Sequence, residues 1–293
     1  MDARVEQPTL PVQKSTNDRA IIRVPAPIRL GFQAASLISP SLGAEVARQL
    51  FFRPARMPYR DEQRAVLAGA QRLLLNTREQ PVQAYCWGEG PAVLLLHGWS
   101  GHSGQMTEFV APLTQAGYRV IAVDAPAHGQ SAGRLSSAVH FVYAIMAAAR
   151  AFGPFHAVIA HSFGAIAVTH ALSRGFCVKR TVFIAPQAHL HGYWSMFRAT
   201  LGMRDDVWRV MRDRTERWLK IRYDQLHPAF HAPRMKTPLL ILHGTADRMT
   251  PISEGETLAG LWPGAQFQPL DCGHLGILRD WRALLASVDF VKG

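Results

Sequence analysis

The feature that most constrains the fold of this chain is an alternation of short apolar runs with helical patterns, which begins near residue 91. The runs are too short for helices and almost wholly apolar, as is typical of strands buried on both faces of a sheet. Residues 70–88 are expected to add two earlier strands. The six runs are Ala92–Leu96, Val120–Val123, Ala157–Ala160, Val182–Ala185, Leu239–Leu242 and Phe267–Leu270.

Helical patterns fill the intervals between these runs. Met106, Phe109, Val110 and Leu113 recur at helical spacing, and Gly117 provides a helix end. Strands and helices in alternation predict an α/β fold, in which a mostly parallel sheet carries helices on both faces. Further helical stretches are expected over 139–149, from Ser162 to Gly175, and over 278–288.

Two segments interrupt the alternation and predict additions to a core of residues 61–186 and 237–293. Residues 187–236 separate two predicted strands, are too long for an ordinary crossover, and are rich in aromatic residues and Met. They predict an inserted helical cap. Residues 1–60 predict a partly helical N-terminal arm, with amphipathic helices near Ile28–Leu37 and Leu42–Phe52.

The net charge of +11 is concentrated in these two additions, which carry +5 each. Charge so localised suits anionic ligands or an anionic lipid surface, although a solvated basic surface is the preferred interpretation. Nucleic acid is not an expected partner, because no recognition module is present and the arginines alternate with acidic residues.

The segment "IAHSFGA" (159–165) places Ser162 between two small residues, Ala160 and Gly164, after an apolar run and before a helical one. A tight strand-to-helix turn leaves no room for bulk two residues on either side of its central side chain. This is the nucleophile elbow, usually G-x-S-x-G. Ala160 replaces the first glycine, and we expect its methyl group to be tolerated. Taken alone, the motif also fits an ordinary turn after a strand.

Three other segments supply partners for this serine. "LLLHGWSG" (94–101) directs the Trp99 N–H toward Ser162, and with the Phe163 N–H it predicts an oxyanion hole. "LLILHGTADRMTP" (239–251) places Asp247 in a loop after a strand, and "DCGHLGIL" (271–278) places His274 beyond the last one. Asp271 is the alternative acid.

At these residues, over roughly 70–293, the chain resembles the α/β-hydrolase family, whose members keep the order Ser…Asp…His. "VDAPAHGQS" (123–131) is similar to the family's Asp-x-x-Gly-His-Gly-x-Ser loop, with Ala127 in place of the first glycine. Together, HGW, AHSFGA and GHLGILRD resemble a bacterial group of esterase-like hydrolases. The resemblance implies the α/β-hydrolase fold and favours Asp247 as the acid.

The implied function is a serine hydrolase that cleaves small-molecule carboxylic esters with an apolar acyl or alcohol part, through an acyl-enzyme and without a cofactor. Thioesterase, amidase or C–C bond hydrolase activity with the same triad is the alternative. A serine at this position argues against dehalogenase or epoxide hydrolase chemistry, for which the family uses aspartate. A non-catalytic binding protein on the same fold is the alternative of another class.

The cap is expected to line the substrate pocket through Trp194, Phe197, Met203 and Trp208, with packing onto the core as the alternative. His189 and His191 have a spacing that two metal ligands use on a strand. No cysteine or carboxylate cluster accompanies them, so no metal site is expected.

The arm helices are expected to pack against the hydrolase domain or a second subunit, which would bury their apolar residues. Peripheral contact with an anionic membrane is the alternative. The N-terminal sequence lacks a secretory signal and the three cysteines form no disulfide pattern, so a cytoplasmic protein is expected. The arm residues are Ile28, Leu30, Phe32, Leu37, Ile38, Leu42, Val46, Leu50 and Phe51.

Overall fold

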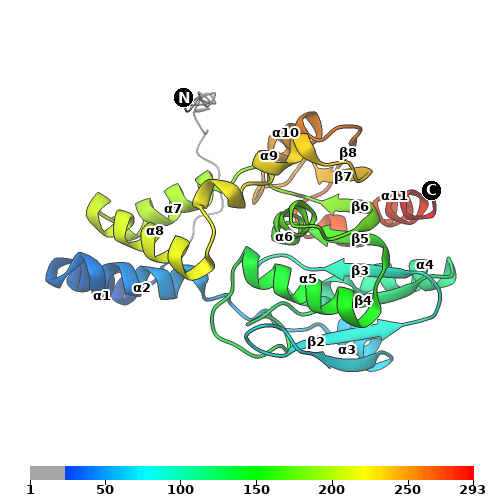
Figure 1. The fold of residues 1–293 in the computed structure, drawn as a ribbon, viewed down its shortest axis with the longest axis horizontal. Helices are drawn as coiled ribbons and strands as arrows, with labels where there is room; N and C mark the ends of the chain where they lie inside the picture. The colour runs from blue at the N-terminus through cyan, green and yellow to red at the C-terminus, as the bar shows by residue number, and fades with distance from the viewer. Residues whose placement is uncertain (1–23) are drawn as a thin grey trace, which may run out of the picture.

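A computed structural model describes residues 24–293, in which eight strands form one sheet (Figure 1). The strand order is β1-β2-β4-β3-β5-β6-β7-β8, with β2 antiparallel to both neighbours and every other pair parallel. The α/β fold with a mostly parallel sheet is therefore confirmed. The strands are β1 (Gln71–Leu75), β2 (Val82–Trp87), β3 (Ala92–Leu96), β4 (Arg119–Val123), β5 (Phe155–His161), β6 (Val178–Ile184), β7 (Leu239–Gly244) and β8 (Gln266–Leu270).

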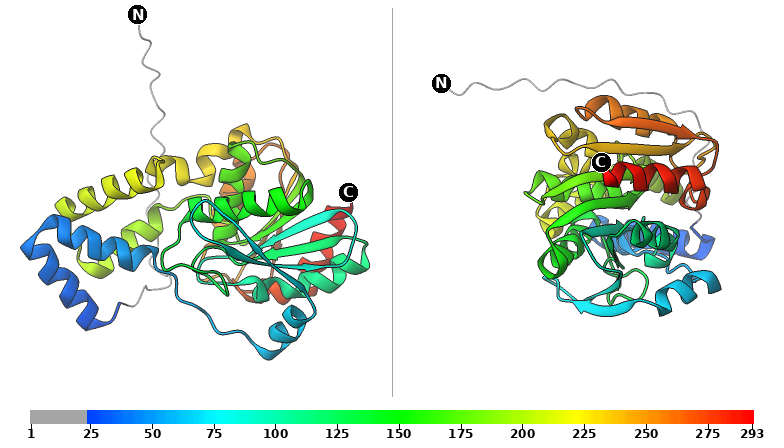
Figure 2. Two further views of the ribbon diagram at one scale, coloured as in Figure 1. Left: turned by 60° about the horizontal axis from the view of Figure 1, so that its bottom comes forward. Right: turned by 90° about the vertical axis from the view of Figure 1, so that its right-hand side faces the viewer.

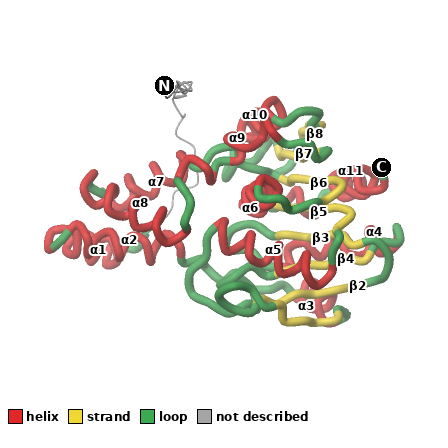
Figure 3. The backbone as a smooth tube through the Cα atoms, viewed as in Figure 1, coloured by secondary structure: helices red, strands yellow, loops and turns green. Residues whose placement is uncertain are grey.

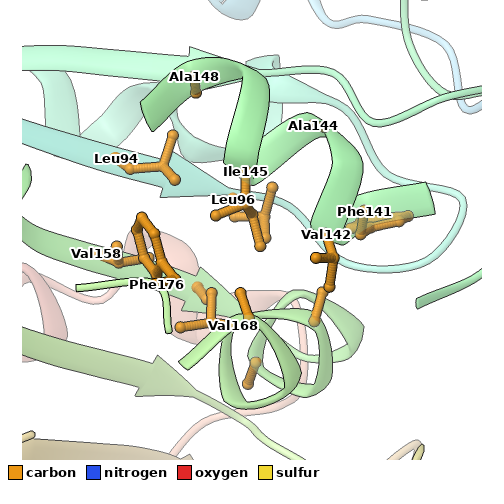
Figure 4. Packing of buried hydrophobic residues seen from close by; sticks show 14 of the residues in the cluster. Leu94, Leu96, Phe141, Val142, Ala144, Ile145, Ala148, Val158, Val168 and Phe176 are labelled. Carbon is orange, nitrogen blue, oxygen red and sulfur yellow. The ribbon is translucent and has the colours of Figure 1, made fainter. Parts of the chain in front are cut away.

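Helices cover both faces of this sheet, which explains why its central strands carry buried apolar residues on both faces. On one face, α5 and α6 pack on the sheet, and Figure 4 shows Ile145 of α5 beside Leu96 of β3, in a cluster that also contains Leu94 and Val168. The other face is covered by η1, α4 and α11. The core helices are α3 (Asp61–Ala68), η1 (Ser103–Phe109), α4 (Val110–Gln115), α5 (Ala138–Phe152), α6 (Phe163–Ser173), α10 (Ile252–Leu261), η4 (Gly276–Arg279) and α11 (Trp281–Lys292).

The segment 187–236, called here the cap segment, is helical between β6 and β7, as Figure 3 shows. Its longest helix, α8, lies beside α2 of the arm, and these helices extend together beyond one end of the sheet (Figures 1 and 2). The elements of the cap segment are α7 (His191–Leu201), α8 (Asp205–Leu219), η2 (Tyr223–Leu226), α9 (Pro228–His231) and η3 (Ala232–Arg234).

The described part of the arm contains α1 (Ala26–Ile38) and α2 (Pro40–Phe52); residues 1–23 lie outside the described range. Both helices join an apolar cluster with the cap segment, called here the arm–cap cluster. The Phe51 ring stacks on Trp194 with centroids 4.0 Å apart. Packing of the arm within the same chain is therefore observed.

The prediction that the apolar arm residues are all buried is wrong. Phe32 is buried, and Val46, Leu50 and Phe51 pack partly buried against the arm–cap cluster. The others remain exposed, because α1 is apolar on two sides and only one side meets the cap segment. The exposed residues are Ile28, Leu30, Leu37, Ile38 and Leu42. None of the helices within 24–293 is both long and apolar enough to cross a membrane.

Candidate active site

Ser162 occupies a strained turn between β5 and α6. Its φ is 51° and its ψ is −116°, a backbone conformation that residues other than glycine rarely adopt. The neighbouring strand holds the turn, because the Ser162 N–H donates to the Ile184 carbonyl over 2.8 Å. The turn therefore places the serine at the carboxyl end of the sheet, as the sequence predicts.

Close backbone contacts explain the small residues around Ser162. A Cβ added at Gly164 would lie 2.8 Å from the His97 carbonyl oxygen and 3.0 Å from that of Leu96. A Cβ at Gly98 would come 3.1 Å from the Ser162 Cβ. Ala160 is fully buried in β5, so its methyl group is accommodated within the strand packing.

Ser162, His274 and Asp247 lie in one hydrogen-bonded line. The Ser162 Oγ is 3.1 Å from His274 Nε2, and His274 Nδ1 is 2.6 Å from Asp247 Oδ2. The second carboxylate oxygen of Asp247 accepts the N–H groups of Met249 and Thr250, both at 2.8 Å. These two bonds fix the carboxylate plane, so that one oxygen faces the imidazole.

Asp271, the alternative acid, does not join this line. It is exposed, and its carboxylate is 3.5 Å from the Thr245 hydroxyl. The loop after β7 thus brings Asp247 to the histidine, while Asp271 points elsewhere.

Two buried neutral histidines brace the line. His161 Nε2 donates to the His274 carbonyl oxygen over 3.1 Å, and His243 Nε2 donates to the Thr250 carbonyl over 3.0 Å. Burial lowers the pKa of both imidazoles, to well below the usual range for His161. His243 was not identified from the sequence, although its place at the end of an apolar strand, just before the Asp247 loop, is visible there.

The sequence profile of the alpha/beta hydrolase family matches residues 93–287, about two thirds of the chain and all of this line. The chain belongs to the α/β hydrolase family.

Solved structures with the same fold include several esterases. An esterase of Pyrococcus furiosus, Pf2001, is 17% identical with a TM-score of 0.61, over 82% of this chain and 98% of its own. Esterase RhEst1 of a Rhodococcus species is 18% identical with a TM-score of 0.58, over 76% and 98%. A bromoperoxidase of Bacillus anthracis is 16% identical with a TM-score of 0.58, over 76% and 100%. At such identities these likenesses show the fold alone.

A curated relative matches over a short segment. The pimeloyl-[acyl-carrier protein] methyl ester esterase of Methylococcus capsulatus is 48% identical over 44 residues. That segment is 15% of this chain and 17% of the relative.

The backbone of this hydrolase carries two free N–H groups beside Ser162. Phe163 is the first residue of α6, where an N–H has no partner within the helix. Trp99 follows Gly98, whose backbone packs against the serine. Within residues 24–293, neither the Trp99 nor the Phe163 amide donates to a protein group.

The loop of residues 123–131 in the hydrolase is fixed by Asp124 and His97. The buried Asp124 carboxylate accepts the Ser103 N–H at 2.7 Å and the Gln130 N–H at 2.8 Å. His97 accepts the Ala125 N–H at Nε2 and donates from Nδ1 to the Gly98 carbonyl, and burial lowers its pKa to about 4. Ala127 has φ of 66°, which explains why glycine is common at this position of the family motif.

A small pocket of about 50 Å³ lies between the cap segment and the loop that carries Asp247. From the cap side it is lined by His189, Tyr193 and Met196, and from the core side by Met249 and Thr250. The remaining lining residues are Gln187, Gly192, Pro251 and Glu254.

The cap residues predicted to bind substrate lie elsewhere, in the arm–cap cluster. Trp194, Phe197 and Met203 are buried there, and Trp208 packs against it partly buried. Their burial is accounted for by the arm, a partner that the sequence does not reveal. Phe163 also touches this cluster, which therefore reaches the turn at the serine.

His189 and His191 do not form part of a metal site in the described range. No group of three His, Cys, Asp or Glu within residues 24–293 is arranged to hold an ion. His189 instead lies 3.5 Å from the Glu254 carboxylate, which also accepts the Ala188 and His189 N–H groups at 2.9 Å.

Proposed function

We propose that this α/β hydrolase is a serine esterase that cleaves carboxylic esters through an acyl-enzyme. The observation that carries the proposal is the hydrogen-bonded line from Ser162 Oγ through His274 to the buried Asp247 carboxylate. A serine hydroxyl is a weak nucleophile unless a base accepts its proton in the transition state. His274 Nε2 is within reach for that role.

In the first half of the reaction, Ser162 Oγ bonds to the ester carbonyl carbon as its proton passes to His274 Nε2. Asp247 keeps the second imidazole proton on Nδ1 and stabilises the imidazolium that forms. The Trp99 and Phe163 N–H groups bind the carbonyl oxygen as it becomes negative. The carbon–oxygen bond to the alcohol then breaks, and His274 gives its proton to the departing alkoxide.

In the second half, water attacks the acyl-enzyme carbonyl and His274 accepts its proton. The same two backbone groups hold the second oxyanion. As this intermediate collapses, the bond to Ser162 Oγ breaks and the serine recovers a proton from His274, so that the acid is released and the enzyme is restored.

Esters with an apolar acyl or alcohol part are the proposed substrates. Tyr193, Met196 and Met249 give the small pocket beside the Asp247 loop an apolar lining, which suits a short alkyl group. The names of the Pyrococcus and Rhodococcus structures, and of the Methylococcus relative, favour ester cleavage over the thioester, amide and C–C alternatives. The three free cysteines support a reducing, cytoplasmic setting.

Labelling with a fluorophosphonate probe tests the proposal. The native protein should react at Ser162, and Ser162→Ala and heat-denatured protein should not. Hydrolysis of matched p-nitrophenyl esters and acyl thioesters of increasing chain length then separates the reaction classes. A native protein that the probe does not label would favour a binding protein on the same fold and overturn the proposal.

A further inference from the structure

Helix α1 is apolar on two opposite faces. Phe32, Ala35 and Ser36 are buried, and Phe32 joins the arm–cap cluster. The helix reads APIRLGFQAASLI, so its one charged residue is Arg29. A helix that is apolar all round normally has all of its sides buried.

Within residues 24–293, no segment covers the outer face of α1. Leu30, Ala34, Leu37 and Ile38 are spaced i, i+4, i+7 and i+8, which places them on one side of the helix. Leu37 is 78% exposed, Ile38 77% and Leu30 62%. Leu42, in the first turn of α2, is 45% exposed. We call these five residues the arm patch, and Figure 2 shows α1 at the outer edge of the molecule.

An apolar surface of this kind marks an interaction site, because single exposed leucines are common but a row of them at helical spacing is not. The patch lies at the far end of the arm from the sheet (Figure 1). It is therefore clear of the elements that support the candidate active site.

The two segments that form the arm and the cap segment are basic. Residues 24–60 and 187–236 contain fifteen Lys and Arg against six Asp and Glu. Arg29 lies on α1, and Arg214 of α8 donates to the Ser41 carbonyl at the α1–α2 turn over 2.7 Å. Glu45, the acidic residue of these two helices, is paired with Arg48, whose hydrogen bonds lower the Glu45 pKa to about 2.

We propose that the arm patch docks on an anionic lipid surface. Such a surface supplies both missing partners: acyl chains for Leu30, Leu37 and Ile38, and negative headgroups for the arginines around them. A second copy of this chain fits less well, because a symmetric contact over the patch would bring two basic surfaces together. The docking does not depend on the proposed esterase activity.

Vesicle sedimentation with the full-length protein tests the proposal. One set of vesicles is phosphatidylcholine, and the other has a third of its lipid replaced by phosphatidylglycerol. The protein should bind the anionic vesicles at least about tenfold more strongly, and high salt should weaken that binding. Leu37→Ser with Ile38→Ser should reduce it by about tenfold.

A matched control variant removes exposed apolar side chains from the α/β domain, away from the arm patch. Leu74 of β1 and Leu285 of α11 are 68% and 53% exposed, and Leu74→Ser with Leu285→Ser should leave vesicle binding unchanged. Because all four positions are exposed, both double variants should melt like the native protein. Arg29→Glu is a second variant that should weaken binding without removing apolar surface.

Three results would overturn the proposal. The first is that the native protein does not bind anionic vesicles. The second is that the patch variant binds them as well as the native protein does, which would make the attraction purely electrostatic. The third is a native dimer in sedimentation equilibrium that the patch variant dissociates, since the patch would then be covered by a second copy.

Discussion

The carboxylate of Asp247 is joined to the imidazole of His274 by a 2.6 Å hydrogen bond across 27 positions of sequence. The two residues follow β7 and β8, which are parallel neighbours in the sheet. Loops at the carboxyl ends of parallel neighbours lie side by side, and this geometry turns a sequence separation into a contact.

Asp247→Asn should lower kcat by about 10³–10⁴-fold, because the amide cannot hold the imidazole in the tautomer that accepts the serine proton. Ester hydrolysis in the steady state provides the measurement. Asp271→Asn is the matched control and should stay within a few-fold of the native rate, since Asp271 is exposed and does not contact His274. If Asp271→Asn were the more damaging change, the assignment of the acid would be wrong.

Filling the pocket beside the Asp247 loop should change the choice of substrate. Met196→Trp places a larger side chain in a space of about 50 Å³ and should shift the preference toward shorter esters. A series of p-nitrophenyl esters measures this shift. Trp194→Phe is the comparison: its ring stacks on Phe51, so it should lower Tm and leave the preference alone. The opposite pattern would place the acyl site in the arm–cap cluster.

The arm should stabilise the fold through its inner face. Phe52 is buried and meets the rings of Trp194 and Trp218, with centroids 6.0 Å and 5.2 Å away. Phe52→Ala should therefore reduce the free energy of unfolding by about 3 kcal/mol. Leu37→Ala, on the exposed face of α1, should change it by about 0.5 kcal/mol or less. Urea unfolding measures both, and equal effects would contradict the packing described for the arm.

Stability should fall as the solution becomes acidic. Burial and the nearby His231 lower the pKa of His170 from 6.5 to about 4, and burial lowers that of His227 to about 3. Between pH 6.5 and 4 the unfolded chain binds protons at these residues that the folded chain does not. Their contribution to stability is therefore complete above pH 6.5 and is lost as pH falls toward about 4 for His170 and about 3 for His227.

Urea unfolding at a series of pH values across this window checks the sign. His170→Gln should make the dependence shallower, because one of the groups no longer titrates. A free energy of unfolding that stays constant from neutral to acidic pH would contradict this prediction. It would show that these histidines take up protons in the folded protein as readily as in the unfolded chain.

The sheet could be predicted because burial on both faces leaves a strong local signal. Each of the six apolar runs forms a strand, from β3 to β8. The order of Ser162, Asp247 and His274 could also be predicted, since each follows such a run and parallel strands end at one edge. α3 and α10 were not among the predicted elements: α3 is short and largely polar, and α10 has no clear apolar stripe.

The arm and the cap segment could be predicted only as separate helices. Their mutual packing joins residues far apart in sequence, such as Phe51 and Trp194, and no local period encodes it. Because the sequence does not show that the arm covers Trp194 and Phe197, these large apolar side chains were expected to line a pocket. The exposure of Leu37 could not be predicted either, because a helix with two apolar faces does not show which face is covered.

The most direct test of the central claim is the kcat of Ser162→Ala for ester hydrolysis, measured beside its thermal melt. The side chain is small and its backbone contacts are kept, so the variant should fold as the native protein does. If Ser162 is the nucleophile, kcat should fall by about 10⁶-fold. For a substrate that the native enzyme turns over slowly, the variant's rate should equal the uncatalysed background. A folded variant whose kcat stays within about tenfold of the native value would contradict the account.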